Sequence, residues 1–224
     1  MSHYSALLRR ALDAAGFEDV PIVSTDPDDA KEMHPGIRLG NLFNVDCLWA
    51  ISMMDILEEL RRKIRPYELR RGETNQISEK GIDRIAGALT KGISPAIAEY
   101  KRVMEKFRGI TYDRSRPRPQ VFVTGEYLVT FHPGSNFHIE EYLEKNGMEV
   151  ILPRMINVFR KDYLARLYEI QSVHVKYPTS TASFTYVAEG LFRYSLHVLE
   201  KEAKKHRSMF PPGRFPNWRR KQSL

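Results

Sequence analysis

Two apolar runs decide the expected fold: Gln120-Val121-Phe122-Val123-Thr124 and Met148-Glu149-Val150-Ile151-Leu152. The first is continuous and stops at Gly125, which is typical of a strand buried on both faces in a parallel sheet. Between the runs, apolar residues at helical spacing predict a short helix over residues 137–145, with Asn146-Gly147 as its stop signal. The order strand, helix, strand predicts a parallel βαβ unit with a right-handed crossover.

Amphipathic helices are expected on both sides of this unit. Residues 45–65 give the clearest pattern, because apolar side chains recur every three or four positions and Pro66 follows. A further helix is expected to begin at Ser94 as its N-cap, with Pro95 in its first turn and Gly109 at its end. A short strand is expected at residues 20–23, and further helices at residues 2–15, 74–89, 159–170 and 185–205.

This order of elements predicts an α/β fold. We expect a Rossmann-like half of a parallel sheet with flanking helices, preceded by a mainly helical segment, as in an incomplete two-lobed scaffold. Arg114, Arg116 and Arg118 alternate with prolines and mark a stiff, basic boundary. The expected divisions are a mainly helical segment with a short strand at 1–111, the connector at 112–119, the Rossmann-like unit at 120–206 and a basic, Pro-rich tail at 207–224.

Composition narrows the class of protein. A chain of 224 residues, 42% hydrophobic and 28% charged, fits one sizeable domain and excludes wholesale disorder and fibrous repeats. No apolar run approaches the roughly 18 residues of a membrane span. The single cysteine, Cys47, excludes an internal disulfide framework and is interpreted as a small apolar residue of a buried helix. We therefore expect a soluble, cytoplasmic chain.

The net charge of +7 is concentrated at the C-terminal end. From residue 201 onward only Glu202 opposes a set of basic residues, so the body of the chain is close to neutral. The alternatives are a solvated tail and a contact with nucleic acid or an acidic membrane surface. The basic residues are Lys201, Lys204, Lys205, Arg207, Arg214, Arg219, Arg220 and Lys221.

The loop at residues 125–136 is the expected ligand site, because open α/β sheets bind ligands at the carboxyl ends of their strands. Ser135 and Asn136 would lie at a helix N-terminus, where free N–H groups attract anions. Glu126 and His132 are the acid–base pair of the loop. Alternatively, Ser135 or Asn136 only caps the helix and His132 only precedes a turn. The candidate ligand-binding residues are Gly125, Glu126, His132, Gly134, Ser135 and Asn136.

No other chemistry is indicated by spacing. No set of His, Cys and carboxylate residues has a convincing metal-ligand spacing, so no metal site is expected. The chain has no Gly-x-Ser-x-Gly elbow of a serine hydrolase, and no catalytic residue is assigned.

Several motifs resemble the C-terminal region of the long, multidomain acyl-CoA dehydratase activators, a region that is itself similar to the D-component of 2-hydroxyglutaryl-CoA dehydratase. The resemblance is carried by residues 119–129 followed by Phe131-His132-Pro133-Gly134-Ser135-Asn136, and by Tyr142-Leu143-Glu144-Lys145-Asn146-Gly147-Met148 with its continuation to Arg154. Arg65-Pro66-Tyr67-Glu68, with Gly72-Glu73 after it, matches a helix-ending motif of that region. Residues 16–22 resemble the strand ahead of that helix.

The resemblance implies a two-lobed α/β scaffold that holds an iron–sulfur cluster. In such systems an ATP-hydrolysing activator passes an electron to a cluster protein, which reduces a 2-hydroxyacyl-CoA and starts radical dehydration. This chain lacks the activator domains, and its resemblance to the family ends near Lys205, where the family continues and this chain has a basic, Pro-rich end instead. One cysteine cannot supply the several thiolates that a cluster requires. No cofactor is therefore expected on this chain.

We therefore expect a fragment or component without catalysis of its own. Its expected partners are the remainder of the dehydratase-activator system or a partner lobe, with acyl-CoA as a possible ligand. The alternative is a nucleic-acid-binding module that uses the basic tail together with the arginines of the connector.

Overall fold

The computed structural model describes residues 3–22 and 41–205, of which 68% are helical and 4% are in strands. The chain divides into two compact units, residues 1–44 and 45–224. The first contains α1 (His3–Ala14). The second contains nearly all of α3 (Asn41–Ile64) and every later element.

In the first unit, α1 is followed by a turn that folds back on it. Gly16 has a positive φ of 80°, and Arg9 donates to the carbonyl oxygens of Phe17 and Val20, at 2.7 Å each. The structure has no strand at residues 20–22, so the prediction there is wrong; Val23 lies outside the described residues. The Val20 carbonyl bonds to the Arg9 side chain and not to a neighbouring strand.

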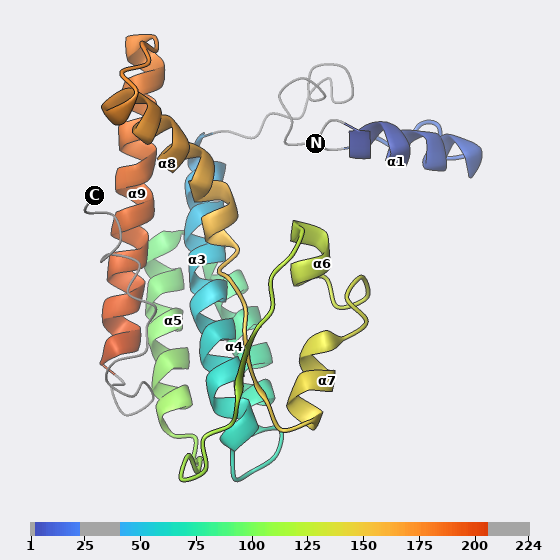
Figure 1. The fold of residues 1–224 in the computed structure, drawn as a ribbon, viewed down its shortest axis with the longest axis vertical. Helices are drawn as coiled ribbons and strands as arrows, with labels where there is room; N and C mark the ends of the chain where they lie inside the picture. The colour runs from blue at the N-terminus through green and yellow to red at the C-terminus, as the bar shows by residue number, and fades with distance from the viewer. Residues whose placement is uncertain (1–2, 23–40, 206–224) are drawn as a thin grey trace. The chain divides into compact units, whose positions relative to one another are not determined.

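The second unit is built on a bundle of α3, α4 (Glu73–Leu89), α5 (Ile93–Arg108) and the lower half of α9 (Thr179–Lys204), as Figure 1 shows. The spacing predicted for α3 and α5 puts their apolar stripes into one core. Tyr100, at the centre, is fully buried and donates to the carbonyl oxygen of Leu199 at 3.2 Å. The core residues are Trp49, Met53, Ile56, Leu57, Leu60, Ile64, Ile85, Ala96, Tyr100, Val103, Met104, Phe107, Ile110, Leu199 and Ala203.

Backbone details explain the helix boundaries. Pro66 ends α3, as predicted, within the 3₁₀ turn η1 (Arg65–Tyr67). α5 begins two residues earlier than expected: Gly92, with a φ of 113°, is its N-cap, so the prediction that Ser94 caps it is wrong. Gly81 lies where α4 meets α5, because a Cβ there would come within 2.6 Å of a methyl carbon of Val103.

The predicted strand pairing is confirmed. β1 (Gln120–Phe122) and β2 (Glu149–Ile151) are parallel, with Val121 opposite Val150. The connection between them contains α6 (Tyr127–Phe131) and α7 (Ile139–Lys145).

The predicted Rossmann-like α/β class is wrong. The described chain has a two-stranded sheet beside a mainly helical body. Strands of parallel sheets are buried on both faces only where helices cover both. Here β1 has one half-buried and two exposed residues, with Phe122 56% exposed. The two helices expected to flank the sheet instead form a hairpin of α8 (Ile156–Ser172) and α9.

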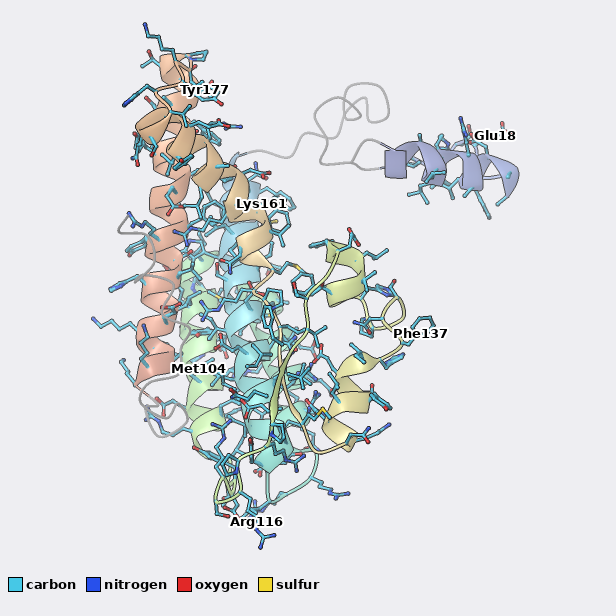
Figure 2. The ribbon with its side chains drawn as sticks, in the orientation of Figure 1. Glu18, Met104, Arg116, Phe137, Lys161 and Tyr177 are labelled. Atoms are coloured by element: carbon cyan, nitrogen blue, oxygen red, sulfur yellow. The ribbon has the colours of Figure 1, made fainter. Side chains whose placement is uncertain are left out.

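The connector at residues 112–119 is bound to the bundle. Arg114 and Arg118 stack on the Tyr67 ring, at 4.5 and 5.6 Å from its centroid. Arg114 also donates to the Lys63 carbonyl oxygen at 2.8 Å, which satisfies a group at the C-terminal end of α3. Arg116, labelled in Figure 2, lies at the end of the bundle where this connector runs.

Candidate functional site

A cavity of about 380 Å³ opens where β2 ends. Its walls come from α3, from the last residue of α6 and from the connection that leads from β2 to α8. We call it the strand-end cavity. Its lining residues are Ala50, Ile51, Met54, Asp55, Glu58, Glu59, Arg62, Phe131, Leu152, Pro153, Arg154 and Met155.

α3 presents two neighbouring stripes. Trp49, Met53 and Leu60 belong to the stripe that enters the bundle core. The cavity stripe lies one position further along at each turn: residues 50–51, 54–55, 58–59 and 62. Side chains three and four positions apart share one helix face, so this stripe forms a continuous wall that is apolar at one end and charged at the other.

Asp55 joins α3 to the start of α8. Its two carboxylate oxygens accept hydrogen bonds from the N–H groups of Met155 and Ile156, at 2.9 and 2.8 Å. These are N–H groups that have no partner within α8 itself, so Asp55 acts as the cap of that helix from a distant part of the chain. Burial raises the pKa of Asp55, although these N–H groups and the nearby Arg154 and Arg62 oppose the rise.

Arg154 lies between two carboxylates at the same wall. It donates two bonds to Glu59 Oε2, at 2.9 and 3.1 Å, and one to Glu200 Oε1 at 2.7 Å. Its side chain is 18% exposed. Burial alone would lower the pKa of Arg154, but the two carboxylates raise it above its usual value. Arg154 therefore links α3, the β2–α8 connection and α9 as a permanent cation.

This triad predicts a loss of stability in acid. Burial would raise the pKa of Glu59 and Glu200, but Arg154 opposes it, together with Lys63 beside Glu59 and Lys204 beside Glu200. Both pKa values are therefore lowered. A glutamate whose pKa is lower in the folded state stabilises the protein at pH values above its unfolded-state pKa of about 4.3. This contribution disappears as the pH falls through the folded-state pKa. Stability measured by urea unfolding should therefore fall between about pH 5 and pH 3.

Substitution of one acid should flatten that profile. Glu59→Gln should lower stability at pH 7 and reduce the change between pH 5 and pH 3. Glu105→Gln is the matched control, because the Glu105 side chain is 54% exposed and pairs with Arg108, itself 45% exposed, at 3.0 Å. An unchanged acid profile in Glu59→Gln would show that the triad does not set the acid response.

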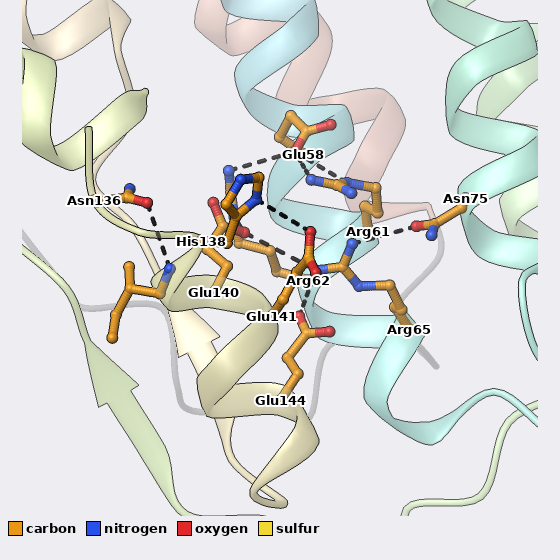
Figure 3. Close-up of polar contacts among 11 residues, drawn as sticks. Glu58, Arg61, Arg62, Arg65, Asn75, Asn136, His138, Glu140, Glu141 and Glu144 are labelled. Carbon is orange, nitrogen blue, oxygen red and sulfur yellow. Dashed lines mark hydrogen bonds and ion pairs between the residues drawn. The ribbon is translucent and has the colours of Figure 1, made fainter. Parts of the chain in front are cut away.

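A second set of ion pairs holds α7 against the end of α3 and η1, as Figure 3 shows. Arg62 Nε donates to Glu140 at 3.0 Å, and Arg65 donates to Glu144 at 2.6 Å. Arg62 also bonds to Glu58 on its own helix at 3.3 Å. These contacts fix one side of the cavity and already engage the Arg62 guanidinium.

The predicted loop residues lie on both sides of α6: Gly125 and Glu126 precede it, and His132, Gly134, Ser135 and Asn136 follow it. The Glu126 carboxylate caps α6 by accepting from the Leu128 N–H at 2.7 Å. Nδ1 of His132 lies 3.2 Å from the Ser135 nitrogen and 3.3 Å from its hydroxyl oxygen. Asn136 Oδ1 accepts a long hydrogen bond from the Ile139 N–H at 3.4 Å.

The two glycines of the loop have different surroundings. A Cβ on Gly134 would lie 3.1 Å from the His132 ring, whereas one on Gly125 would be 3.6 Å from the Thr130 hydroxyl oxygen. The close turn at Gly134 therefore packs against His132. Glu126 bonds to Leu128 near the start of the loop, whereas His132 bonds to Ser135 near its end. The acid and the base therefore have separate partners.

The start of α7 does not favour an anion. Its N-cap is His138, with a φ of 55°, and not Ser135 or Asn136. Glu140 and Glu141 lie in its first turn, where negative side chains already interact with the helix dipole. Phe137 beside it is 90% exposed and is labelled at the outer edge of this loop in Figure 2. Of the loop, only Phe131 reaches the lining of the strand-end cavity.

The described residues do not fit an iron–sulfur cluster or a metal ion. Cys47 is half-buried in α3, and burial, with the neighbouring Asp46 charge, raises the pKa of its thiol. A protonated thiol is a poor metal ligand. Across residues 3–22 and 41–205, no three His, Cys, Asp or Glu side chains are grouped so that they could hold a metal ion.

Comparison with known proteins gives no relative: no protein-family model, curated protein or solved structure matches this chain. None of the helices in the described part of the chain combines the length and apolar character of a membrane span. The function is therefore inferred from the residues and the cavity.

Proposed function

We propose that this chain is a non-catalytic component of a 2-hydroxyacyl-CoA dehydratase activator-like system, which couples ATP-driven electron transfer to radical dehydration. In this proposal the strand-end cavity holds the acyl group of the CoA thioester. The observation that supports it is the cavity itself, which opens at the end of a strand in the region that carries the resemblance.

The lining of the cavity fits an apolar group better than a phosphate. Its volume lies near the lower end of the range of small-molecule sites. Ile51, Met54 and Leu152 offer apolar contacts. Both arginines of the lining are already paired with carboxylates, and three acidic residues outnumber them. The nucleotide portion of the ligand would therefore stay outside.

The charged groups of the cavity support a binding role and not a catalytic one. Asp55 is committed to two N–H groups, and Arg154 and Glu59 are committed to each other. A general acid or base must be able to reach a substrate proton. Each of these side chains would first have to leave a contact that stabilises the fold.

Binding can be measured by calorimetry on the full chain with hexanoyl-CoA and with free CoA as probes. We expect hexanoyl-CoA to bind with a dissociation constant on the order of 1 mM and free CoA at least about tenfold more weakly, since burial of each CH₂ contributes roughly 0.8 kcal/mol. Met54→Trp should fill the cavity and remove the difference between the two ligands.

Leu69→Trp is the matched control, because Leu69 is 62% exposed and is not part of the cavity lining. It should bind both ligands as the unsubstituted chain does. Equal affinity for hexanoyl-CoA and CoA, or an acyl preference that survives Met54→Trp, would contradict the proposed site.

The alternative of nucleic-acid binding receives little support from the connector. Arg114 and Arg118 stack on Tyr67 and bond within the chain, so they are not presented as a phosphate-binding pair. The basic residues after 205 lie outside the described residues.

A further inference from the structure

The strand-end cavity has two walls that come from distant parts of the sequence. One is the cavity stripe of α3, and the other is the connection from β2 to α8, which contributes four consecutive residues. We call these four the connection wall: Leu152, Pro153, Arg154 and Met155. A cavity between two segments keeps its shape only while the segments are held together, so the contacts between the walls decide what it can bind.

Asp55 makes the contact that fixes the backbone of the connection wall to α3. Its two oxygens accept from the N–H groups of Met155 and Ile156, at 2.9 and 2.8 Å. Ile156 is 1% exposed, so water has no ready access to its N–H group if the carboxylate is removed. The end of the connection wall is therefore held at a defined place against α3.

Asp55 replaces a cap that α8 does not provide itself. The N-cap residue of α8, Met155, makes no side-chain capping bond among the described residues, and the first turn contains no acidic residue. The next two N–H groups, those of Asn157 and Val158, bond to the carbonyl oxygens of Arg154 and Met155. The start of α8 therefore depends on a side chain that lines the cavity.

The neighbouring contact of Arg154 does not duplicate this role. Arg154 reaches Glu59 and Glu200 through its guanidinium group, at the end of a long side chain. Several rotatable bonds separate that group from the backbone, so the ion pairs can persist while the backbone moves. Asp55 has a short side chain and bonds to backbone groups directly, so it restrains the connection wall more closely.

We propose that Asp55 is the positioning residue of the strand-end cavity, and that occupancy of the cavity and attachment of the start of α8 stabilise each other. This inference rests on the proposed function for the identity of the ligand. A ligand between the walls would contact Met54 of α3 and Met155 of the connection wall together, so it binds best when Asp55 holds residue 155 in place. By thermodynamic linkage, the ligand strengthens the attachment of α8 by the factor by which that attachment strengthens binding.

Ligand binding to the full chain tests the first half of the proposal. Asp55→Asn retains the size of the side chain and one acceptor oxygen, and it should raise the dissociation constant of hexanoyl-CoA at least about tenfold in calorimetry. Asp162→Asn is the matched control, because Asp162 is exposed on α8 and is not part of the cavity lining. In the unsubstituted chain, saturating hexanoyl-CoA should slow deuterium exchange at the Met155 and Ile156 amides at least about threefold.

A measurement without ligand separates positioning from direct contact with the ligand. In ligand-free Asp55→Asn, NMR relaxation of the methionine methyl groups should show a lower order parameter for Met155 than in the unsubstituted chain. Met53 and Met104 are internal controls, because both are fully buried in the bundle core and should not respond. If Asp55 acted only by touching the ligand, Met155 would keep its order parameter.

The outcomes distinguish this inference from the proposed function. If hexanoyl-CoA does not bind the unsubstituted chain, the proposed ligand is wrong, and the methyl measurement alone decides the role of Asp55. An unchanged order parameter of Met155 in Asp55→Asn, or equal binding of hexanoyl-CoA by both chains, would overturn the inference. If Asp55→Asn unfolds, Met53 and Met104 also lose order. The exchange measurement on the unsubstituted chain then decides, because unchanged exchange at Met155 and Ile156 would exclude the coupling.

Discussion

Replacing Arg154 by alanine should lower the free energy of unfolding by about 3–5 kcal/mol, because it leaves the Glu59 and Glu200 carboxylates without their shared cation. Both carboxylates are mostly buried, at 25% and 30% side-chain exposure. Folded domains are typically stable by only about 5–15 kcal/mol, so the variant should be close to unfolding at 37 °C. Urea unfolding monitored by circular dichroism measures the effect.

Two further variants separate charge from geometry. Arg154→Lys keeps a positive charge but loses the fork that bonds both carboxylates, so it should recover only part of the loss. Arg193→Ala removes an arginine that is 76% exposed and pairs with Glu189 at 3.6 Å, and it should change stability by less than about 1 kcal/mol. A similar effect of Arg154→Ala and Arg193→Ala would mean that burial does not distinguish the two ion pairs.

The local elements were predictable because their signals are local. Apolar residues at helical spacing and the stops at Pro66 and Gly109 locate α3 and α5 to within a few residues. The parallel pairing of β1 with β2 also followed from two short apolar runs and the helix between them. Each of these inferences depends on residues close together in the sequence.

The fold class was not predictable in the same way. The run Gln120-Val121-Phe122-Val123-Thr124 has the composition of a strand covered on both faces, but its burial depends on which helices pack against it. In this structure α9 packs on α8 through Phe192, on α3 through Tyr194 and on α5 through Leu199. Phe122 stays exposed. An amphipathic pattern shows that a helix has a partner and does not say which one.

The cavity was missed for a related reason. Glu58, Glu59 and Arg62 have the pattern of a solvated helix face, whereas the structure covers that face with Arg154 and Glu140. Arg154 lies 95 positions from Glu59, and Glu140 lies 78 positions from Arg62. The available signal was the second stripe on α3, shifted by one position from the core stripe.

Glu149 is the buried acid that ties β2 to the bundle, and its removal should have the second large effect. It is 2% exposed and accepts hydrogen bonds from the Tyr67 hydroxyl at 2.9 Å, Arg114 at 3.1 Å and the Gln120 side chain at 3.0 Å. Burial raises the pKa of Tyr67, so its hydroxyl stays protonated and donates to Glu149. Glu149 therefore joins the end of α3, the connector and both strands.

Glu149→Ala should cost about 3 kcal/mol or more, because it leaves the buried Tyr67 hydroxyl without its acceptor and Arg114 without its counter-charge. Glu149→Gln retains the shape and an acceptor oxygen, so it should cost clearly less. The loss should be local first: the Val123 N–H, bonded to the Ile151 carbonyl at 3.0 Å, should exchange with deuterium faster in Glu149→Ala, while amides of the α5 core should respond only through global stability. If Val123 and the α5 amides lose protection equally, Glu149 stabilises the whole unit and not the attachment of the strands.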